Sequence, residues 1–175
     1  MRKRKRRQRP SKEEYYLNIA KAVAQRATCL RRIFGAVLVV DDEIRATGYC
    51  GAPRGAPNCI DLGYCEREKQ GIPSGERYEY CKSVHAECNT IISVARRDAK
   101  NGILYLYGED LVNNNPYFGI EPCIFCKRFI INAGIKKVIT SNLGGDVSKF
   151  HVEDWIADES YMIYEGGSKD GKDQS

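Results

Sequence analysis

Two short motifs, about forty residues apart, contain the residues of this chain that are best suited to bind a metal ion. The first, His-x-Glu, begins at His85, and the second, Pro-Cys-x-x-Cys, has its cysteines at Cys123 and Cys126. One His and two Cys supply three protein ligands to zinc and leave a fourth position for water, which is typical of catalytic rather than closed structural sites. The fold must therefore bring both motifs together.

Each motif is followed by an apolar run that suits a helix, so we expect both motifs at helix N-termini. Side chains of a first helical turn lean toward the N-terminus, which lets His85 and Glu87 serve one site. Cys123 and Cys126 are three residues apart and share a helix face, and Pro122 suits a first turn. The positive ends of two helix dipoles favour thiolates. Glu87 is left as an unligated carboxylate beside the metal.

The pair H-x-E and P-C-x-x-C is the signature of zinc deaminases. A lone C-x-x-C is also found in redox pairs and zinc ribbons, and a lone H-x-E carries no information. Together, at this separation, they indicate a deaminase. The alternative is a structural zinc site with a Glu that takes no part in chemistry.

A length of 175 residues with 42% hydrophobic content predicts one folded domain with a sizeable core. We find no apolar run of membrane-spanning length and no secretory signal, and we expect a cytoplasmic protein without membrane contact. Eight cysteines in such a chain indicate metal binding in a reducing compartment more than a disulfide framework.

The net charge of +5 comes from one end of the chain. Residues 2–9 hold seven Lys or Arg, which leaves 21 basic against 23 acidic residues elsewhere. The folded part is therefore not a basic nucleic-acid surface. The run at 1–10 is interpreted as a disordered tail, with phosphate binding or targeting as alternatives.

Hydrophobic patterns predict a three-layer α/β/α sandwich with a five-stranded mixed sheet over residues 11–165, and a disordered tail over 166–175. A capping box of Ser11 and Glu14 begins the first helix. The expected helices span 12–27, 85–98, 125–133 and 151–158. The expected strands span 35–40, 44–49, 103–107, 137–140 and 161–164. Residues 51–84 show little periodicity, which is unusual unless something ties them down.

Several stretches resemble the deoxycytidylate (dCMP) deaminases of the cytidine deaminase superfamily. They are residues 27–32, 35–37, 46–49, 51–53, 71–77, 85–87, 122–123 and 130–136. The resemblance covers about residues 11–142. It implies a cytidine deaminase-like fold, a zinc held by His85, Cys123 and Cys126, and hydrolysis of dCMP to dUMP and ammonia for thymidylate synthesis.

The resemblance also implies roles for residues around the metal. A zinc-activated water attacks C4 of the pyrimidine, while Glu87 takes the water proton, delivers it to N3 and helps protonate the departing amine. Ala86 and Pro122 are expected to contact the pyrimidine base, and Tyr49 and Cys50 are expected to lie near the substrate. The family usually has Asn where this chain has Cys50, which lacks an amide's donors and acceptors.

Two features keep other functions open. The Glu-Pro-Cys sequence at residues 121–123 resembles the one in tRNA adenosine deaminases and riboflavin-pathway deaminases, so their substrates are alternatives. Cytidine is a further alternative substrate. The loop 108–121 is longer than we expect of the family and would reshape the mouth of the pocket. A non-enzymatic zinc-stabilised protein that binds nucleic acid through its basic tail is the other class, and its binding would be sensitive to salt.

A second, structural zinc is predicted from the remaining cysteines. Cys29 precedes the first strand, and Cys59, Cys65 and Cys81 lie in or at the end of the irregular segment, which an all-thiolate zinc would pin. Dimetal members of the family carry ligands at positions resembling Cys29 and Cys59. The alternative is four reduced cysteines without a shared ligand.

The expected oligomeric state and nucleotide effectors are implied by the resemblance to the family, and individual residues of this sequence do not indicate them. The family commonly forms dimers or hexamers, and regulated relatives respond to dCTP as activator and dTTP as inhibitor. Arg77, Lys82 and Lys127 are candidates for phosphate binding by chemistry alone.

Three further residues are predicted to be structural. Cys88 is expected to pack against the sheet as a small apolar side chain. His151 is expected at the surface or at a helix cap, and Trp155 in the core.

Overall fold

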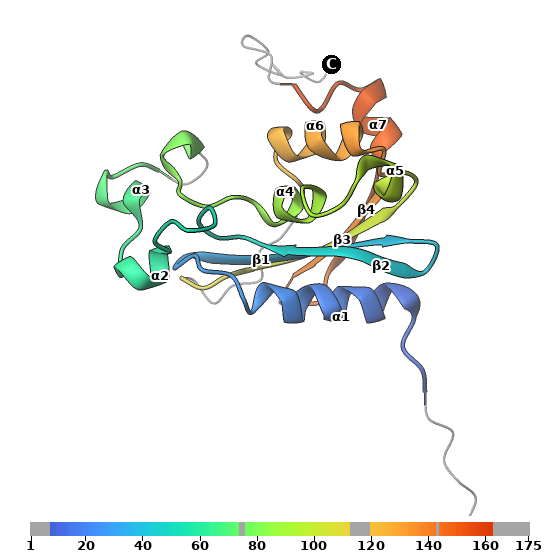
Figure 1. Ribbon diagram of the computed structural model, residues 1–175, viewed down its shortest axis with the longest axis horizontal. Helices are drawn as coiled ribbons and strands as arrows, with labels where there is room; N and C mark the ends of the chain where they lie inside the picture. Colours follow the sequence, from blue (N-terminus) through green and yellow to red (C-terminus); the bar gives the residue numbers. More distant parts are fainter. Residues whose placement is uncertain (1–7, 74–75, 113–119, 143, 163–175) are drawn as a thin grey trace, which may run out of the picture.

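The computed structural model describes residues 8–73, 76–112, 120–142 and 144–162, and its centre is a five-stranded sheet in the order β2-β1-β3-β4-β5 (Figure 1). The strands are β1 (Arg32–Val40), β2 (Glu43–Tyr49), β3 (Ile103–Asp110), β4 (Lys137–Asn142) and β5 (Val147–His151). β3 and β4 pair in parallel and the other neighbours pair antiparallel. The predicted mixed sheet is confirmed.

Helices cover both faces of the sheet, as Figure 1 shows. On one face lies α1 (Lys12–Ala24). On the other lie α4 (Ala86–Ile91), α5 (Arg96–Ala99), α6 (Ile124–Ala133) and α7 (Val152–Ala157). A separate buried apolar cluster fills each interface, and Trp155, 3% exposed, belongs to the second one. The predicted three-layer α/β/α sandwich is therefore confirmed.

The first helix begins as the sequence predicts but ends three residues early. Ser11 is its N-cap, and its Oγ accepts a hydrogen bond of 3.1 Å from the Glu14 amide. Residues 25–27 continue as turns, in which each amide bonds the carbonyl three residues before it.

The prediction of one continuous helix over 85–98 is wrong, because the structure has two separate helices, α4 and α5, in this region. The hydroxyl of Ser93 donates to the Asn89 carbonyl at 2.7 Å, and that of Thr90 donates to the Ala86 carbonyl at 2.8 Å. Such bonds to the preceding turn weaken and bend a helix. The chain leaves the helix after Ile91 and begins a new one at Arg96.

The predicted fifth strand at 161–164 is also wrong. The fifth strand is β5, at the edge of the sheet, where it pairs with β4. Tyr161 and Met162 lie in a turn, and residues 163–164 are outside the described part of the chain. His151 ends β5 as the exposed N-cap of α7, as expected.

Residues 51–84 are more ordered than their sequence indicates. They contain the short helices α2 (Cys59–Leu62) and α3 (Glu66–Lys69) and a 3-10 turn, η1 (Tyr78–Tyr80). The predicted disorder of the two tails falls largely on residues 1–7 and 163–175, outside the described residues. No helix within the described ranges is long and apolar enough to cross a membrane.

Gly48 lets α4 approach the sheet closely. A Cβ at this position would lie 2.5 Å from the backbone nitrogen of Thr90 and 2.7 Å from the carbonyl oxygen of Ala86. Both atoms belong to α4, so a side chain at 48 would push this helix away from β2.

We predict that Gly48→Ala lowers the free energy of unfolding by about 1–3 kcal/mol, because overpacking against a backbone is not easily relieved. Urea unfolding measures this change. Thr47→Ala, at the exposed neighbouring position, is the control and should change stability by less than about 0.5 kcal/mol. Equal stability of the two variants would contradict the close packing of α4.

Candidate metal centre and active site

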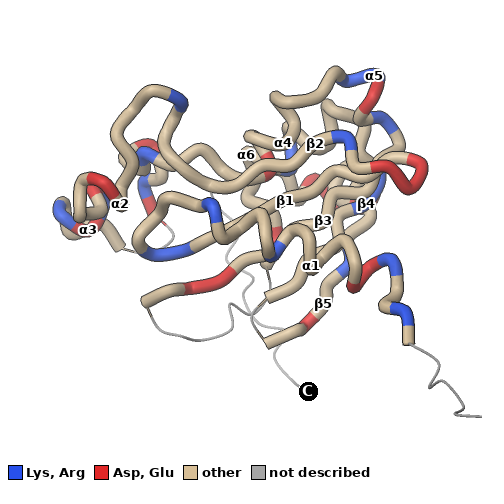
Figure 2. Tube along the Cα trace, turned by 60° about the horizontal axis from the view of Figure 1, so that its bottom comes forward, with Lys and Arg blue, Asp and Glu red and all other residues tan. Residues whose placement is uncertain are grey.

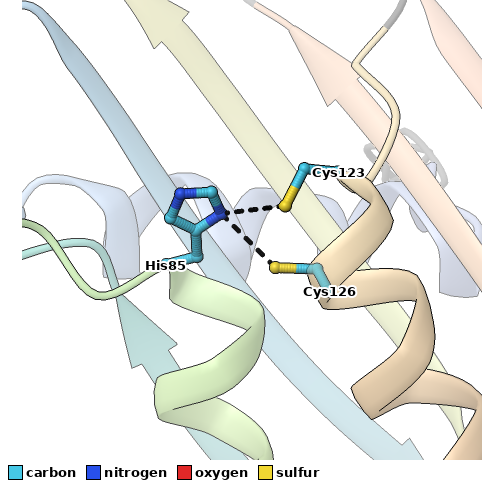
Figure 3. Close-up of side chains that lie close together, drawn as sticks. All are labelled: His85, Cys123 and Cys126. Carbon is cyan, nitrogen blue, oxygen red and sulfur yellow. Dashed lines mark hydrogen bonds between the residues drawn. The ribbon is translucent and has the colours of Figure 1, made fainter. Parts of the chain in front are cut away.

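The N-termini of α4 and α6 bring the two motifs together, as Figure 3 shows. His85 is the N-cap of α4, Cys123 is the N-cap of α6, and Cys126 lies in the first turn of α6. The Nδ1 atom of His85 is 3.5 Å from the sulfur of Cys123 and 3.3 Å from that of Cys126. The three ligand atoms lie within 4.8 Å of one another.

These distances fit a zinc ion. Zinc bonds of about 2.0 Å to nitrogen and 2.3 Å to sulfur, at tetrahedral angles, hold the two donor atoms about 3.5 Å apart. The two measured separations of 3.5 Å and 3.3 Å match this value. The His-Cys-Cys set is therefore a zinc-binding site, as its ligand chemistry predicts.

Backbone and side-chain bonds fix the entry to α4. The amide of Gly51 bonds the carbonyl of Val84 at 3.2 Å, and the reverse bond is 2.7 Å, so the chain just before His85 is held beside the end of β2. The amide of the Asn89 side chain donates to the Tyr49 carbonyl at 2.8 Å. The residues before and after His85, Val84 and Asn89, are thus both hydrogen-bonded to the end of β2 or to the chain that follows it.

The metal-binding side chains share protons in the metal-free protein. Hydrogen bonding to Cys126, supported by His85, lowers the pKa of Cys123 to about 4. The hydrogen bond that His85 donates to the Cys123 thiolate raises the pKa of His85 to about 9, against the effect of burial. Hydrogen bonds with Cys123 and Cys88 raise the pKa of Cys126. One thiolate is therefore ready to receive a cation.

Cys88 does more than pack as a small apolar side chain. It is half-buried against the helix-side core, as predicted, but its sulfur is also 3.8 Å from that of Cys126. It is not part of the group of ligand atoms that lie within 4.8 Å of one another in the described chain. Cys88 therefore contacts a ligand without completing the ligand set.

Glu87 is buried in the first turn of α4 and lies outside that same ligand group. Burial raises the pKa of its carboxyl, while the neighbouring His85 lowers it. A buried carboxyl next to a metal centre, with no place among the ligands, suits proton transfer.

A cavity of about 180 Å³ opens beside this centre. His85, Ala86, Glu87 and Cys123 line it. Phe34, Leu106 and Ile120 contribute apolar surface. The rest of the lining comes from Cys50, Glu121, residues of the 51–84 segment and the stretch 29–32. The metal centre is therefore reachable from a pocket that is apolar in part and has polar groups at defined points, as small-molecule sites are.

The predicted substrate-binding residues differ in their positions. Ala86 lines the cavity, whereas Pro122 is buried between two lining residues. Cys50 lines the cavity, but its sulfur accepts from the Phe34 amide at 3.3 Å and donates to the Arg32 carbonyl at 3.5 Å. Tyr49 is 37% exposed and does not belong to the lining.

None of the three phosphate candidates lines this cavity. Arg77 is exposed, pairs with Glu79 and lies over the Tyr80 ring. Lys82 is exposed. Lys127 is buried, pairs with Glu121 and donates to Ser160.

Sequence reasoning missed three arginines and one tyrosine in the lining. They are Arg31, Arg32, Arg67 and Tyr78. Arg31 and Arg32 stand in one of the stretches that resemble the deaminase family, and this was the available signal. Nothing in the local sequence marks Arg67 or Tyr78.

The four cysteines predicted to hold a second metal lie in one region. The Ile60 amide bonds the Thr28 carbonyl at 3.3 Å, which brings the start of α2 beside Cys29. Burial, followed by repulsion from Cys29, Cys65 and Cys81, raises the pKa of Cys59. Among the described residues, no three of these sulfurs lie within 4.8 Å of one another.

The sheet, the His-Cys-Cys centre and the adjacent buried Glu87 define a zinc-dependent deaminase. Residues 10–142 match the family described as the cytidine and deoxycytidylate deaminase zinc-binding region. The chain belongs to this family, which confirms the resemblance seen in its sequence.

Individual relatives agree with this assignment. A deoxycytidylate deaminase of Mycobacterium phage D29 is 39% identical over 136 residues, which are 75% of this chain and 94% of the relative. A deoxycytidylate deaminase of Schizosaccharomyces pombe is 36% identical over 75% of this chain, which spans 37% of that longer protein. A crystal structure of dCMP deaminase from cyanophage S-TIM5 in complex with dCMP and dUMP has 25% identity and a TM-score of 0.54, and it aligns over 77% of this chain and 83% of its own.

We predict that Cys126→Ala removes the zinc of this centre, because two protein ligands hold the ion much more weakly than three. Metal analysis of protein purified without chelator measures the loss. Cys88→Ala is the matched control on the neighbouring sulfur and should keep the full zinc content. Loss of zinc in the control would make Cys88 a ligand and contradict the assigned set.

Proposed function

We propose that this chain hydrolyses dCMP to dUMP and ammonia and so supplies dUMP for thymidylate synthesis. The observation that carries the proposal is the grouping of His85, Cys123 and Cys126 beside the buried Glu87, in a chain that aligns with 94% of a deoxycytidylate deaminase. A cavity that leads to these residues accounts for access of a small substrate.

Zinc bound by His85, Cys123 and Cys126 supplies Lewis-acid chemistry and lowers the pKa of a bound water toward neutrality. The remaining steps belong to the chain. Glu87 accepts one proton from the water and donates it to N3 of the base. It then accepts the second proton from the oxygen that has added to C4 and donates it to the amine, which departs as ammonia while the C4 carbonyl forms. The apolar wall beside it excludes bulk water from these transfers. One carboxylate can serve all of them because it is held at a fixed position in the first turn of α4.

A nucleic-acid-binding role is less well supported. Figure 2 shows Lys and Arg interspersed with Asp and Glu along the described chain, without the single basic face that phosphate backbones attract. The basic run at 2–7 lies outside the described residues. Assembly into homo-oligomers, control by dCTP and dTTP, and a cytoplasmic location stay predictions.

Substrate choice is tested by ammonia release from dCMP, CMP, deoxycytidine, dCTP and tRNA. We expect dCMP to be the best substrate. We further predict that Glu87→Gln lowers turnover at least about 100-fold, because the amide cannot exchange the protons, while zinc content stays unchanged. Zinc loss in this variant would make Glu87 a ligand, and equal turnover would remove it from the mechanism.

We also propose a second, structural zinc held by Cys29, Cys59, Cys65 and Cys81. Cys29, Cys65 and Cys81 line the cavity, and Cys59 begins α2, which is hydrogen-bonded to the chain next to Cys29. One ion bound by the four thiolates would link α2, α3 and η1 to the chain before β1. A closed thiolate site contributes folding energy directly.

We predict two zinc ions per chain, falling to one in Cys59→Ser, with the 51–84 segment becoming sensitive to protease. Metal analysis and limited proteolysis measure both effects, and Cys88→Ala serves as the control that keeps two ions. One zinc per chain in the wild type and in Cys59→Ser would end the idea.

A further inference from the structure

Arg67 is a buried cation in the cavity of the metal centre. It is 5% exposed, although it lies in α3, a helix of only one turn. It lines the same cavity as His85 and Glu87. Arginine is rarely buried to this extent unless its charge and its donors are matched.

The contacts of Arg67 within the described chain leave its charge unmatched. Its Nη2 donates to the backbone carbonyls of Pro73 and Glu76, and its guanidinium lies over the Tyr78 ring, 4.5 Å from the ring centre. Nε is buried without a hydrogen-bond partner, and Nη1 donates to none of the described residues. No described carboxylate lies within the 4.0 Å of an ion pair.

The other two arginines of the lining differ in this respect. Arg31 pairs with Glu68 at 3.0 Å, and Arg32 pairs with Asp110 at 3.3 Å. Their charges are already met by carboxylates. Arg67 is therefore the arginine of this lining that has no carboxylate partner among the described residues.

Its position relative to the metal centre suits a nucleotide. The Tyr78 ring neighbours both groups, since its centre lies 4.5 Å from the Arg67 guanidinium and 6.2 Å, edge-on, from the centre of the His85 ring. Arg67 and His85 line the same cavity, so a mononucleotide with its base at the metal centre can extend its phosphate to Arg67. Guanidinium groups match phosphate oxygens in charge and geometry.

We propose that Arg67 binds the 5′-phosphate of the substrate and thereby selects a nucleotide over a nucleoside, an inference that rests on the proposed deaminase function. Nη2 keeps its two carbonyl partners and orients the plane of the guanidinium. Nη1 then donates to the phosphate oxygens, while Nε stays enclosed by the protein. The competing role for Arg67 is as a counter-charge to the thiolates of the nearby Cys65 and Cys81.

The test compares zinc-loaded wild type, Arg67→Gln, Arg67→Lys and Arg77→Gln on dCMP and deoxycytidine. Loss of a charged hydrogen bond predicts a fall of about 10- to 100-fold in kcat/KM for dCMP with Arg67→Gln, and little change for deoxycytidine. Arg67→Lys keeps the positive charge but lacks the planar pair of donors. Its kcat/KM for dCMP should lie between those of the wild type and Arg67→Gln. Arg77→Gln is the matched control, because Arg77 is exposed and points its donors at Glu79 and Tyr80.

Binding of dUMP and deoxyuridine, measured by calorimetry, separates this inference from the proposed function. Wild type should prefer dUMP, and Arg67→Gln should lose that preference while keeping its zinc. If no cytosine substrate released ammonia but the dUMP preference and its loss were seen, the proposed activity alone would fail. Equal losses on both ligands, a fall in zinc content, or no preference in the wild type would overturn the phosphate role.

Discussion

The packing of α4 beside α6 on one face of the sheet is the constraint on which the site depends. Both helices begin at the same end, so the N-cap residues His85 and Cys123 meet there and Cys126 follows one turn later. Buried side chains of both helices, among them Ala86 and Ile130, belong to one apolar cluster. Displacing either helix would separate ligands whose atoms now lie within 4.8 Å.

The residues of the metal centre and of the cavity beside it come from several short stretches of chain. Cys126 of α6 packs in the apolar cluster that contains Leu104 of β3 and Val138 of β4, while the chain just after β2 holds the chain before His85. Arg67 and Tyr78, which belong to the segment 51–84, line the same cavity. The proposals therefore place catalysis at the starts of α4 and α6, and recognition of the substrate phosphate at Arg67 in the segment 51–84.

Much of the fold could be predicted from the sequence because its patterns are local. The capping serine of α1, the apolar run of β1 and the glycine that ends α6 each report on their own neighbours. β5 was missed because an edge strand with alternating exposure gains its stability from backbone pairing with β4. The metal ligands were found because their spacing is a motif, whereas Arg67 is brought to the site by tertiary packing alone.

The proposed chemistry requires one metal ion at the junction of α4 and α6, with Glu87 beside it but not bound to it. Anomalous scattering from crystals of the zinc-loaded protein, measured at the zinc absorption edge, tests this most directly. We predict a peak about 2.0 Å from Nδ1 of His85 and about 2.3 Å from the sulfurs of Cys123 and Cys126, with the Glu87 oxygens beyond bonding distance. No peak at this junction, or a peak bonded to Glu87, would contradict the account.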